Sequence, residues 1–257
     1  MIVLTTTKEK SAEIELKFSD LNFYHFPCIE YTAPRDEYKA IDAAIRTNHL
    51  YEWVFFLSQK AAEVYFERLL AIGGNFFNLS NHLKFAVIGK ATKEFLENEI
   101  NMPIDFVPSQ ANSDCFIKEF TQKFHYDFDC AFKVLLPRSE LACDDFKEKL
   151  EASKNYELDI VPAYNTISPI KSNLELIELR EKLPDIKTIV FMSTSCVQNF
   201  SKLAVSLDFS DKTFYSIGVK TTQAIKEHFP GHESIVESAK AELESIFDYA
   251  AQNTNRI

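Results

Sequence analysis

The sequence predicts an α/β protein in which one α/β unit occurs twice, each copy a parallel sheet flanked by helices. Short runs of β-branched and aromatic residues alternate with amphipathic stretches along the whole chain. These runs lack polar alternation, which is typical of strands that are buried on both faces. In addition, three segments of the first half recur in the second half in the same order, which indicates a duplication.

The predicted strands alternate with helical stretches, as they do in βαβ units. In chain order the strands are 2–5, 24–29, 53–57, 85–88, 104–107, 133–136, 158–161, 188–192, 214–217 and 234–236. Between them, apolar residues at helical spacing mark one face over residues 62–70 and part of another over residues 146–152.

The duplication is seen in three pairs of segments. They are 53–58 with 188–193, 85–92 with 214–221, and 2–5 with 133–136. Extended segments with Pro and Tyr, 27–34 and 162–169, lie at equivalent points and are typical of crossings between lobes. Two architectures fit this pattern. Each copy folds by itself, or the chain leaves the first domain early, builds the second and returns.

Composition excludes several classes of protein. Only 5 of the 257 residues are glycine, against an average of about 7 %. Neither G-x-G-x-x-G nor G-x-x-x-x-G-K-[ST] is present. The net charge of −10 argues against nucleic acid or an anionic membrane as a partner. Without a C-x-x-C motif, a signal-peptide pattern or an apolar run of membrane-spanning length, we expect a reduced, cytoplasmic protein.

The turns that follow the predicted strands are polar, and this edge of an open α/β sheet is where ligands bind. They offer hydroxyls, backbone N–H groups and cations at helix starts, a combination that suits carboxylates or phosphates. Gly89 and Gly218 occupy corresponding turns, where the backbone approaches either a packed helix or a ligand. The candidate binding residues of these turns are Ser58, Lys90, Thr92, Arg138, Ser193, Ser195, Gly218, Lys220, Thr221 and Thr222.

For any single turn, helix capping is the favoured explanation. Ser195 and Gln198 have the spacing of a capping box, and Thr92 and Ser58 resemble ordinary N-caps. The binding interpretation depends on the whole set, because both copies place such turns at corresponding sheet ends. The scattered histidines predict no metal site, and no G-x-S-x-G motif surrounds Ser58 or Ser193.

The order and spacing of these turns resemble those of uroporphyrinogen-III synthase over nearly the whole chain. The resemblance is carried by segments 55–58, 87–92, 106–108 with Asn112 and Ser113 following, 135–139, 161–166, 190–193 and 217–222. It implies two interleaved lobes with a cleft between them. The implied first domain is 1–32 plus 171–257, the second is 37–162, and the linker strands are 33–36 and 163–170.

The resemblance also implies a chemistry. The expected reaction is the cyclisation of hydroxymethylbilane, an octacarboxylate linear tetrapyrrole, to uroporphyrinogen III with inversion of ring D and loss of water, without a cofactor. Tyr164 is then expected to assist departure of the hydroxyl. The polar turn residues, with Asn112 and Ser113, are expected to bind substrate. The resemblance implies a monomeric lyase of haem biosynthesis that takes its substrate over from hydroxymethylbilane synthase.

The sequence also departs from the family pattern. Many bacterial members carry Thr-Arg-Pro after the first strand, where this chain has Thr5, Thr6 and Thr7, and Leu57 and Met192 replace a threonine before the turn serines. These departures weaken particular carboxylate contacts, and the loss of the Thr-Arg-Pro pattern favours an alternative, a catalytically inactive two-lobed α/β ligand-binding or regulatory homologue. A response-regulator-like protein fits poorly because no acidic cluster ends the first strand. The residues that favour the synthase are Tyr164, Thr92, Thr221 and Thr222.

Overall fold

The computed structural model describes residues 1–75, 79, 83–124, 131–142, 144–153, 155–238 and 247. The chain divides into two compact units. Unit 1 comprises Met1–Tyr31 and Ile167–Ile257, and unit 2 comprises Thr32–Thr166. The chain thus leaves unit 1 after Tyr31 and returns to it at Ile167. Of the domain predicted over 171–257, residues 239–246 and 248–257 lie outside the described part.

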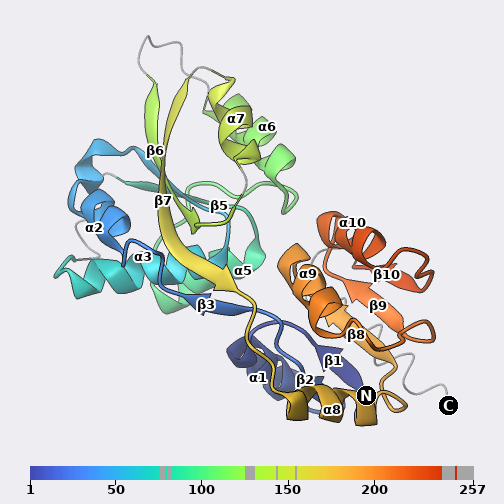
Figure 1. Ribbon diagram of the computed structural model, residues 1–257. Helices are drawn as coiled ribbons and strands as arrows, with labels where there is room; N and C mark the ends of the chain where they lie inside the picture. Colours follow the sequence, from blue (N-terminus) through green and yellow to red (C-terminus); the bar gives the residue numbers. More distant parts are fainter. Residues whose placement is uncertain are drawn as a thin grey trace. The chain divides into compact units, whose positions relative to one another are not determined.

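Unit 1 is a parallel sheet with helices on both faces (Figure 1). Its sheet order is β10-β9-β8-β1-β2. The strands are β1 (Ile2–Leu4), β2 (Phe23–His25), β8 (Thr188–Phe191), β9 (Thr213–Ser216) and β10 (Ile235–Glu237). The helices are α1 (Lys8–Lys17), α8 (Asn173–Lys182), α9 (Thr194–Leu203) and α10 (Val219–His228).

Each face of this sheet has its own core, because neighbouring residues of a strand point to opposite faces. Val3 packs with Phe200 of α9 and Ile225 of α10 in one cluster. Its neighbour Leu4 packs with Ile14 of α1 in another. Strands without polar alternation follow directly from this two-sided burial.

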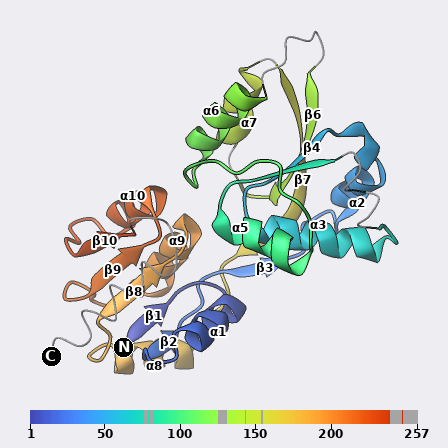
Figure 2. The same cartoon turned by 180° about the vertical axis from the view of Figure 1, so that it is seen from behind.

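Unit 2 is also a sheet with helices on both faces, with α2 and α3 on one face and α6 and α7 on the other (Figure 2), and its strands β4 to β7 pair in parallel. Its sheet order is β3-β7-β6-β4-β5. The strands are β3 (Glu30–Thr32), β4 (Trp53–Phe56), β5 (Lys84–Val87), β6 (Phe132–Ser139) and β7 (Tyr156–Ile167). The α-helices are α2 (Lys39–Arg46), α3 (Gln59–Ala71), α5 (Lys90–Glu94), α6 (Ser113–Lys123) and α7 (Asp145–Glu151). A 3-10 turn, η1 (Asn48–Leu50), precedes β4, and a π-helical turn, η2 (Phe95–Glu99), continues α5.

Strand order confirms the duplication. The segments predicted to be equivalent, β1 and β6, β4 and β8, and β5 and β9, occupy corresponding positions in the two sheets. Beyond β5, Phe106 forms a parallel bridge with Ala86, where β10 lies beside β9 in unit 1. Unit 1 therefore has the spatial order 2-1-3-4-5, and the strands of unit 2 correspond to it when β3 at the edge is set aside and the bridge at Phe106 takes the fifth position. In unit 2 the chain forms the counterpart of the third strand, β4, before those of the first and second, β6 and β7.

Three predicted strands differ from the structure. Segment 104–107 is reduced to the single bridge at Phe106, because prolines at 103 and 108 have no amide N–H to donate. Segment 24–29 forms a strand only as far as His25, and Pro27 interrupts it, although the Cys28 N–H still donates to the Thr5 carbonyl at 2.9 Å. Residues 33–36 form no strand; β3 lies just before them.

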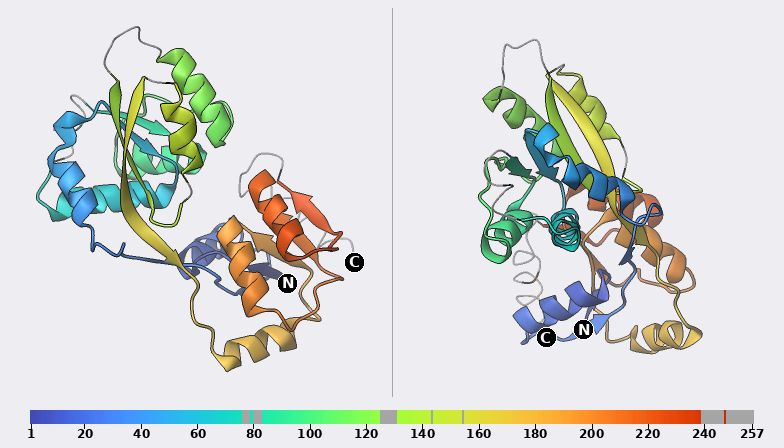
Figure 3. Two further views of the ribbon diagram at one scale, coloured as in Figure 1. Left: turned by 45° about the horizontal axis from the view of Figure 1, so that its top comes forward. Right: turned by 90° about the vertical axis from the view of Figure 1, so that its left-hand side faces the viewer.

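The second predicted linker, 163–170, begins inside β7 and not after it. Strand β7 stays paired with β6 as far as Tyr164 beside Ser139, and it continues to Ile167. Figure 3 shows the long, adjacent β6 and β7 in yellow-green and yellow. Tyr164 is therefore held by a sheet and not by a free linker.

Candidate active site

The carboxyl ends of parallel strands lie at one edge of each sheet, and a 2-1-3-4-5 sheet binds ligands where its strand order reverses. In unit 2 this point lies between β4 and β6, and in unit 1 between β8 and β1. Ser58 is the second residue after β4, and Arg138 is the second-last residue of β6. Ser193 follows β8 in the same way. The edge of each sheet therefore carries predicted site residues.

Ser58 and Tyr164 are brought together although they are 106 positions apart in the chain. Ser58 is the N-cap of α3, as capping predicted, and its Oγ accepts the Ala61 N–H at 3.2 Å. The same Oγ lies 3.1 Å from the Tyr164 hydroxyl. Tyr164 is 8 % exposed, so a mostly buried phenol hydroxyl stands at the carboxyl edge of the sheet.

The surroundings of Tyr164 pull its pKa in opposite directions. Burial raises the pKa of Tyr164, whereas the hydrogen bond with Ser58 and the positive charge of Lys60 lower it. Glu63 raises it, but Glu63 is itself held by the Lys60 Nζ at 3.2 Å and by the Gln59 Nε2 at 2.9 Å. The phenol thus stays protonated near neutral pH while donors and a cation stand ready to stabilise its anion.

Two of the three predicted cations, Arg138 and Lys90, lie beside carboxylates. Arg138 is 14 % exposed in its side chain, and its Nη2 donates to Asp144 Oδ1. The Lys90 Nζ lies 3.8 Å from Glu94 Oε1 on the exposed side of α5. Lys220 is exposed in the first turn of α10.

The capping predictions are wrong for two of the turn residues. Ser193, not Ser195, caps α9, because the extended backbone of Ser193 lets its Oγ accept the Cys196 N–H at 3.2 Å. Ser195 lies half-buried inside the first turn. Thr92 lies inside α5, whose N-cap is Gly89, and it is buried.

The turn before α6 is built as a cap. Asn112 accepts the Cys115 N–H at 2.8 Å through its side-chain oxygen, and Ser113 begins the helix. A Cβ on Gly89 would lie 3.2 Å from the Cβ of Ala111 in this turn. The backbone at Gly89 therefore approaches the turn before α6, which is neither the packed helix nor the ligand expected as the reason for a glycine there.

The corresponding turn of unit 1 begins at Gly218, the N-cap of α10, whose backbone is extended. Thr221 is buried, as its counterpart Thr92 is. The Thr222 hydroxyl lies 2.5 Å from Ser216 Oγ and donates to Glu237 Oε2 at 2.5 Å. A carboxylate thus already accepts from the hydroxyl that was expected to bind substrate.

The three threonines after β1 are buried and serve the fold. Thr5 donates to the Val190 carbonyl at 2.7 Å, and Thr7 caps α1 by accepting the Lys10 N–H at 3.2 Å. In the part of the chain that the structure describes, no group of three or more His, Cys, Asp or Glu side chains is placed to hold a metal ion.

Sequence reasoning named the turn of Ser58 but not the side chains that act on Tyr164. Lys60 and Glu63 are spaced i,i+3 near the start of α3, and this spacing was the available signal. Their relation to Tyr164 was hidden because it depends on β6 lying between β4 and β7.

The fold and the site define a class of protein, a duplicated doubly wound α/β protein with polar turns at the carboxyl edge of each sheet. The family described as uroporphyrinogen-III synthase HemD matches residues 13–248. The chain belongs to this family. It is 26 % identical over 249 residues to the porphyrin biosynthesis protein HemD of Ruminiclostridium josui. The aligned region covers 96 % of this chain and 47 % of that protein. The chain thus spans about half the length of this curated relative.

Solved structures share the fold. A uroporphyrinogen-III synthetase from Helicobacter pylori matches with a TM-score of 0.65 at 14 % identity, over 98 % of each chain. A mutant uroporphyrinogen III synthase from Thermus thermophilus matches with a TM-score of 0.64 at 15 % identity, over 100 % of this chain and 99 % of that one. At these identities the likeness is one of fold.

Proposed function

We propose that this chain is a uroporphyrinogen-III synthase, which cyclises hydroxymethylbilane to uroporphyrinogen III with loss of water and inversion of ring D. The observation that carries the proposal is the buried Tyr164 hydroxyl, held by Ser58 at the ligand-binding edge of a sheet in a chain of this family. The reaction needs a proton donor for one departing hydroxyl, and a phenol in this position meets that need.

In the proposed reaction the C–O bond of the substrate's hydroxymethyl group breaks, and its electron pair leaves with the oxygen. Tyr164 gives its proton to that oxygen, which departs as water, and the pyrrole nitrogen lone pair stabilises the resulting azafulvene cation. The ring D carbon that bears its substituent attacks this cation to form a spiro intermediate. The intermediate fragments and recloses inverted, and the proton lost on aromatisation returns to the Tyr164 phenolate. No external cofactor enters this balance.

Binding is proposed to come from local donors, because the whole chain carries a net charge of −10. Helix starts after Ser58, Asn112, Ser193 and Gly218 present backbone N–H groups, which favour carboxylates. Lys220 is exposed in the first turn after Gly218, and Lys90 is exposed at the start of the short helix α5. Holding eight carboxylates orients the reacting ends, and orientation of this kind supplies up to about 7–11 kcal/mol in favourable intramolecular reactions.

The cellular setting is proposed from the family resemblance alone. No helix in the described part of the chain is long and apolar enough to cross a membrane. We place the enzyme in the cytoplasm as a monomer that takes its unstable substrate from hydroxymethylbilane synthase. Sedimentation of the purified chain with and without that enzyme tests both the monomer and the hand-over.

One assay tests the activity. Hydroxymethylbilane is supplied, the products are oxidised, and the type I and type III isomers are separated. We expect type III in excess, and type I alone at the rate without enzyme would refute the synthase. The alternative, an inactive ligand-binding homologue, is favoured by one observation: the position of the family's cation after β1 is taken by buried threonines. Saturable tetrapyrrole binding without type III product would establish it.

A further inference from the structure

We propose that Ser58 is a positioning residue, which donates its hydroxyl proton to Tyr164 and so leaves the Tyr164 proton for the substrate's departing hydroxyl. This inference rests on the proposed function. It assigns Ser58 a role different from the carboxylate contact that the sequence suggested. Its basis is the contact of Ser58 Oγ with two partners at once, the Ala61 N–H at 3.2 Å and the Tyr164 hydroxyl at 3.1 Å.

Either hydroxyl can donate in the contact between Ser58 and Tyr164, and the proposal assigns the proton of this hydrogen bond to Ser58. A serine hydroxyl has one proton and two lone pairs. Its oxygen already accepts from the Ala61 amide, so its proton is available for Tyr164. The opposite direction would commit the Tyr164 proton to Ser58 and leave none for the substrate. With Ser58 as donor, both of its bonds form and Tyr164 keeps its proton.

The start of α3 strengthens this arrangement. Ser58 caps a 13-residue helix, whose N-terminal end carries a partial positive charge. When Tyr164 releases its proton, the phenolate accepts a hydrogen bond from the Ser58 hydroxyl, and the Ala61 amide, which donates to the same serine oxygen, polarises that hydroxyl. Lys60 adds a full positive charge, and Ser58 and Lys60 both oppose the effect of burial on the pKa of Tyr164. Burial keeps the proton on the phenol until it is needed, and the serine eases its release.

Unit 1 shows what the same turn does without this partner. Ser193 corresponds to Ser58 and accepts the Cys196 N–H at 3.2 Å, as Ser58 accepts that of Ala61. There the Ser193 hydroxyl donates to the Cys196 thiol at 3.2 Å. The methyl group of Ala61 offers no such acceptor in unit 2. The hydroxyl that is bonded within its own helix in unit 1 is therefore directed to Tyr164 in unit 2.

The test uses Ser58→Gly, because glycine at an N-cap costs only a few tenths of a kcal/mol while it removes the hydroxyl. Ser172→Gly is the matched control, since Ser172 is also a serine N-cap and accepts the Glu175 N–H at 3.2 Å. The phenol pKa of Tyr164 is read by NMR of ring-labelled tyrosine, with the resonance assigned by its absence in Tyr164→Phe. Turnover to the type III isomer is measured in parallel against pH.

We expect Ser58→Gly to raise the Tyr164 pKa, because the phenolate loses a hydrogen-bond donor. We expect kcat to fall about tenfold, which corresponds to about 1.4 kcal/mol, with little change in KM. Ser58→Thr should restore both values, and Ser172→Gly should leave both unchanged. In the Tyr164→Phe background, Ser58→Gly should have no further effect on kcat. An unchanged pKa, a rise in KM alone, or full additivity with Tyr164→Phe would overturn the proposal.

A second variant keeps the cap intact. Ala61→Cys reproduces in unit 2 the serine–thiol pair of unit 1, and it should draw the Ser58 proton away and raise the Tyr164 pKa. If Ser58→Gly fails to fold, this shift decides the question, and its absence counts against the proposal. The NMR measurement needs no activity. A chain that makes no type III isomer would refute the proposed function, while the pKa shift would still support or overturn the coupling of Ser58 to Tyr164.

Discussion

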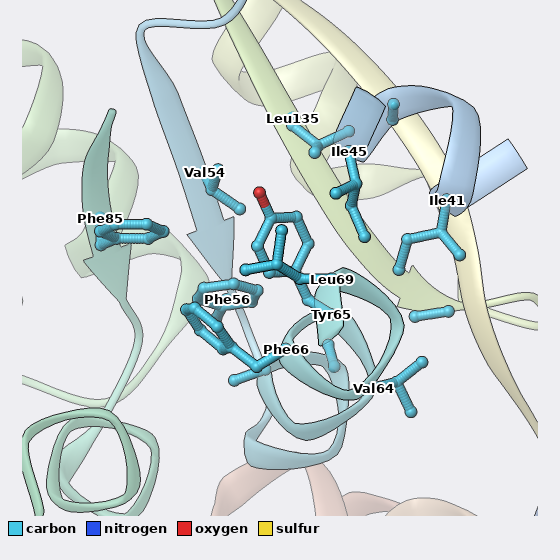
Figure 4. Packing of buried hydrophobic residues seen from close by; sticks show 14 of the residues in the cluster. Ile41, Ile45, Val54, Phe56, Val64, Tyr65, Phe66, Leu69, Phe85 and Leu135 are labelled. Carbon is cyan, nitrogen blue, oxygen red and sulfur yellow. The ribbon is translucent and has the colours of Figure 1, made fainter. Parts of the chain in front are cut away.

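Replacing Tyr65 with phenylalanine should stabilise unit 2. Tyr65 lies on α3 and is fully buried, and its ring packs edge-on against Phe56 and Phe66 with centroids 5.5 and 5.2 Å apart. Its hydroxyl has no hydrogen-bond partner in the described part of the chain. Figure 4 shows the oxygen pointing among aliphatic side chains that include Val54 and Leu135. Phenylalanine would keep the ring contacts and remove the unpartnered group.

The expected gain follows from the cost of that group. A buried polar group without a partner costs about 1–3 kcal/mol. The space left by one oxygen offsets part of this, so we expect a gain of about 1 kcal/mol, which is a rise in Tm of about 4 °C. Burial also raises the pKa of Tyr65. Above about pH 10 the unfolded tyrosine ionises first and favours unfolding, so the advantage of Tyr65→Phe should grow there.

Urea unfolding followed by fluorescence measures the effect in unit 2, because the chain has 1 tryptophan and Trp53 is buried in that unit. Tyr51→Phe is the control, since the Tyr51 hydroxyl donates to Asp159. Its loss leaves a carboxylate without this donor and should cost about 1–2 kcal/mol. If Tyr65→Phe destabilises unit 2 as Tyr51→Phe does, the Tyr65 hydroxyl has a partner and the reasoning fails.

Three further outcomes are expected. Tyr164→Phe should lower turnover about 100-fold, the lower end of general acid catalysis, without moving the urea midpoint, and unchanged kinetics would make Tyr164 structural. Phe120→Ala should lower the free energy of unfolding of unit 2 by about 3–5 kcal/mol in the same fluorescence measurement. Phe120 is fully buried, and its ring centroid lies 4.9 Å from that of Trp53. A loss below about 1 kcal/mol would contradict this expectation. The backbone N–H of Ser172 holds the pKa of Glu175 down to about 2. The contribution of this lowered pKa to the free energy of unfolding is present above the unfolded pKa of about 4 and is lost as the pH falls toward 2. Glu175→Gln should therefore flatten the dependence of stability on pH between about 4 and 2, measured by circular dichroism. An unchanged slope would count against this role of Glu175.

The elements that the sequence predicted well are those decided by local pattern. The central strands β4, β6, β8 and β9 are buried on both faces, and short β-branched and aromatic runs mark such strands clearly. Residues 104–107 carry a similar apolar pattern, but the prolines on either side, Pro103 and Pro108, have no backbone N–H to donate. Only one bridge therefore forms there. Hydrophobic runs predict burial, and backbone hydrogen bonding decides whether a buried run becomes a strand.

The candidate site was predictable as a set of turns but not as a set of contacts. Thr92 and Thr221 have the residue type of a binding turn, yet both are buried within their helices. Thr222 has its carboxylate partner in Glu237, from the next strand along the chain. The burial and the partners of these side chains depend on how a helix is rotated against its sheet, and the sequence of a turn does not determine that rotation. The Ser58–Tyr164 contact, likewise, requires the order of the strands in the sheet.

The duplication explains why the two units contribute differently. Aligning Pro27 with Pro162, the position of Tyr164 corresponds to Ile29, which is buried in the apolar core of unit 1. Aligning β1 with β6, the position of Arg138 corresponds to Thr7, which caps a helix. Only one hydroxyl leaves the substrate in the proposed reaction, so one proton donor suffices. A second phenol would have no departing group to protonate. Unit 1 is then free to satisfy its turns internally, and the acid step of the proposed mechanism belongs to unit 2 alone.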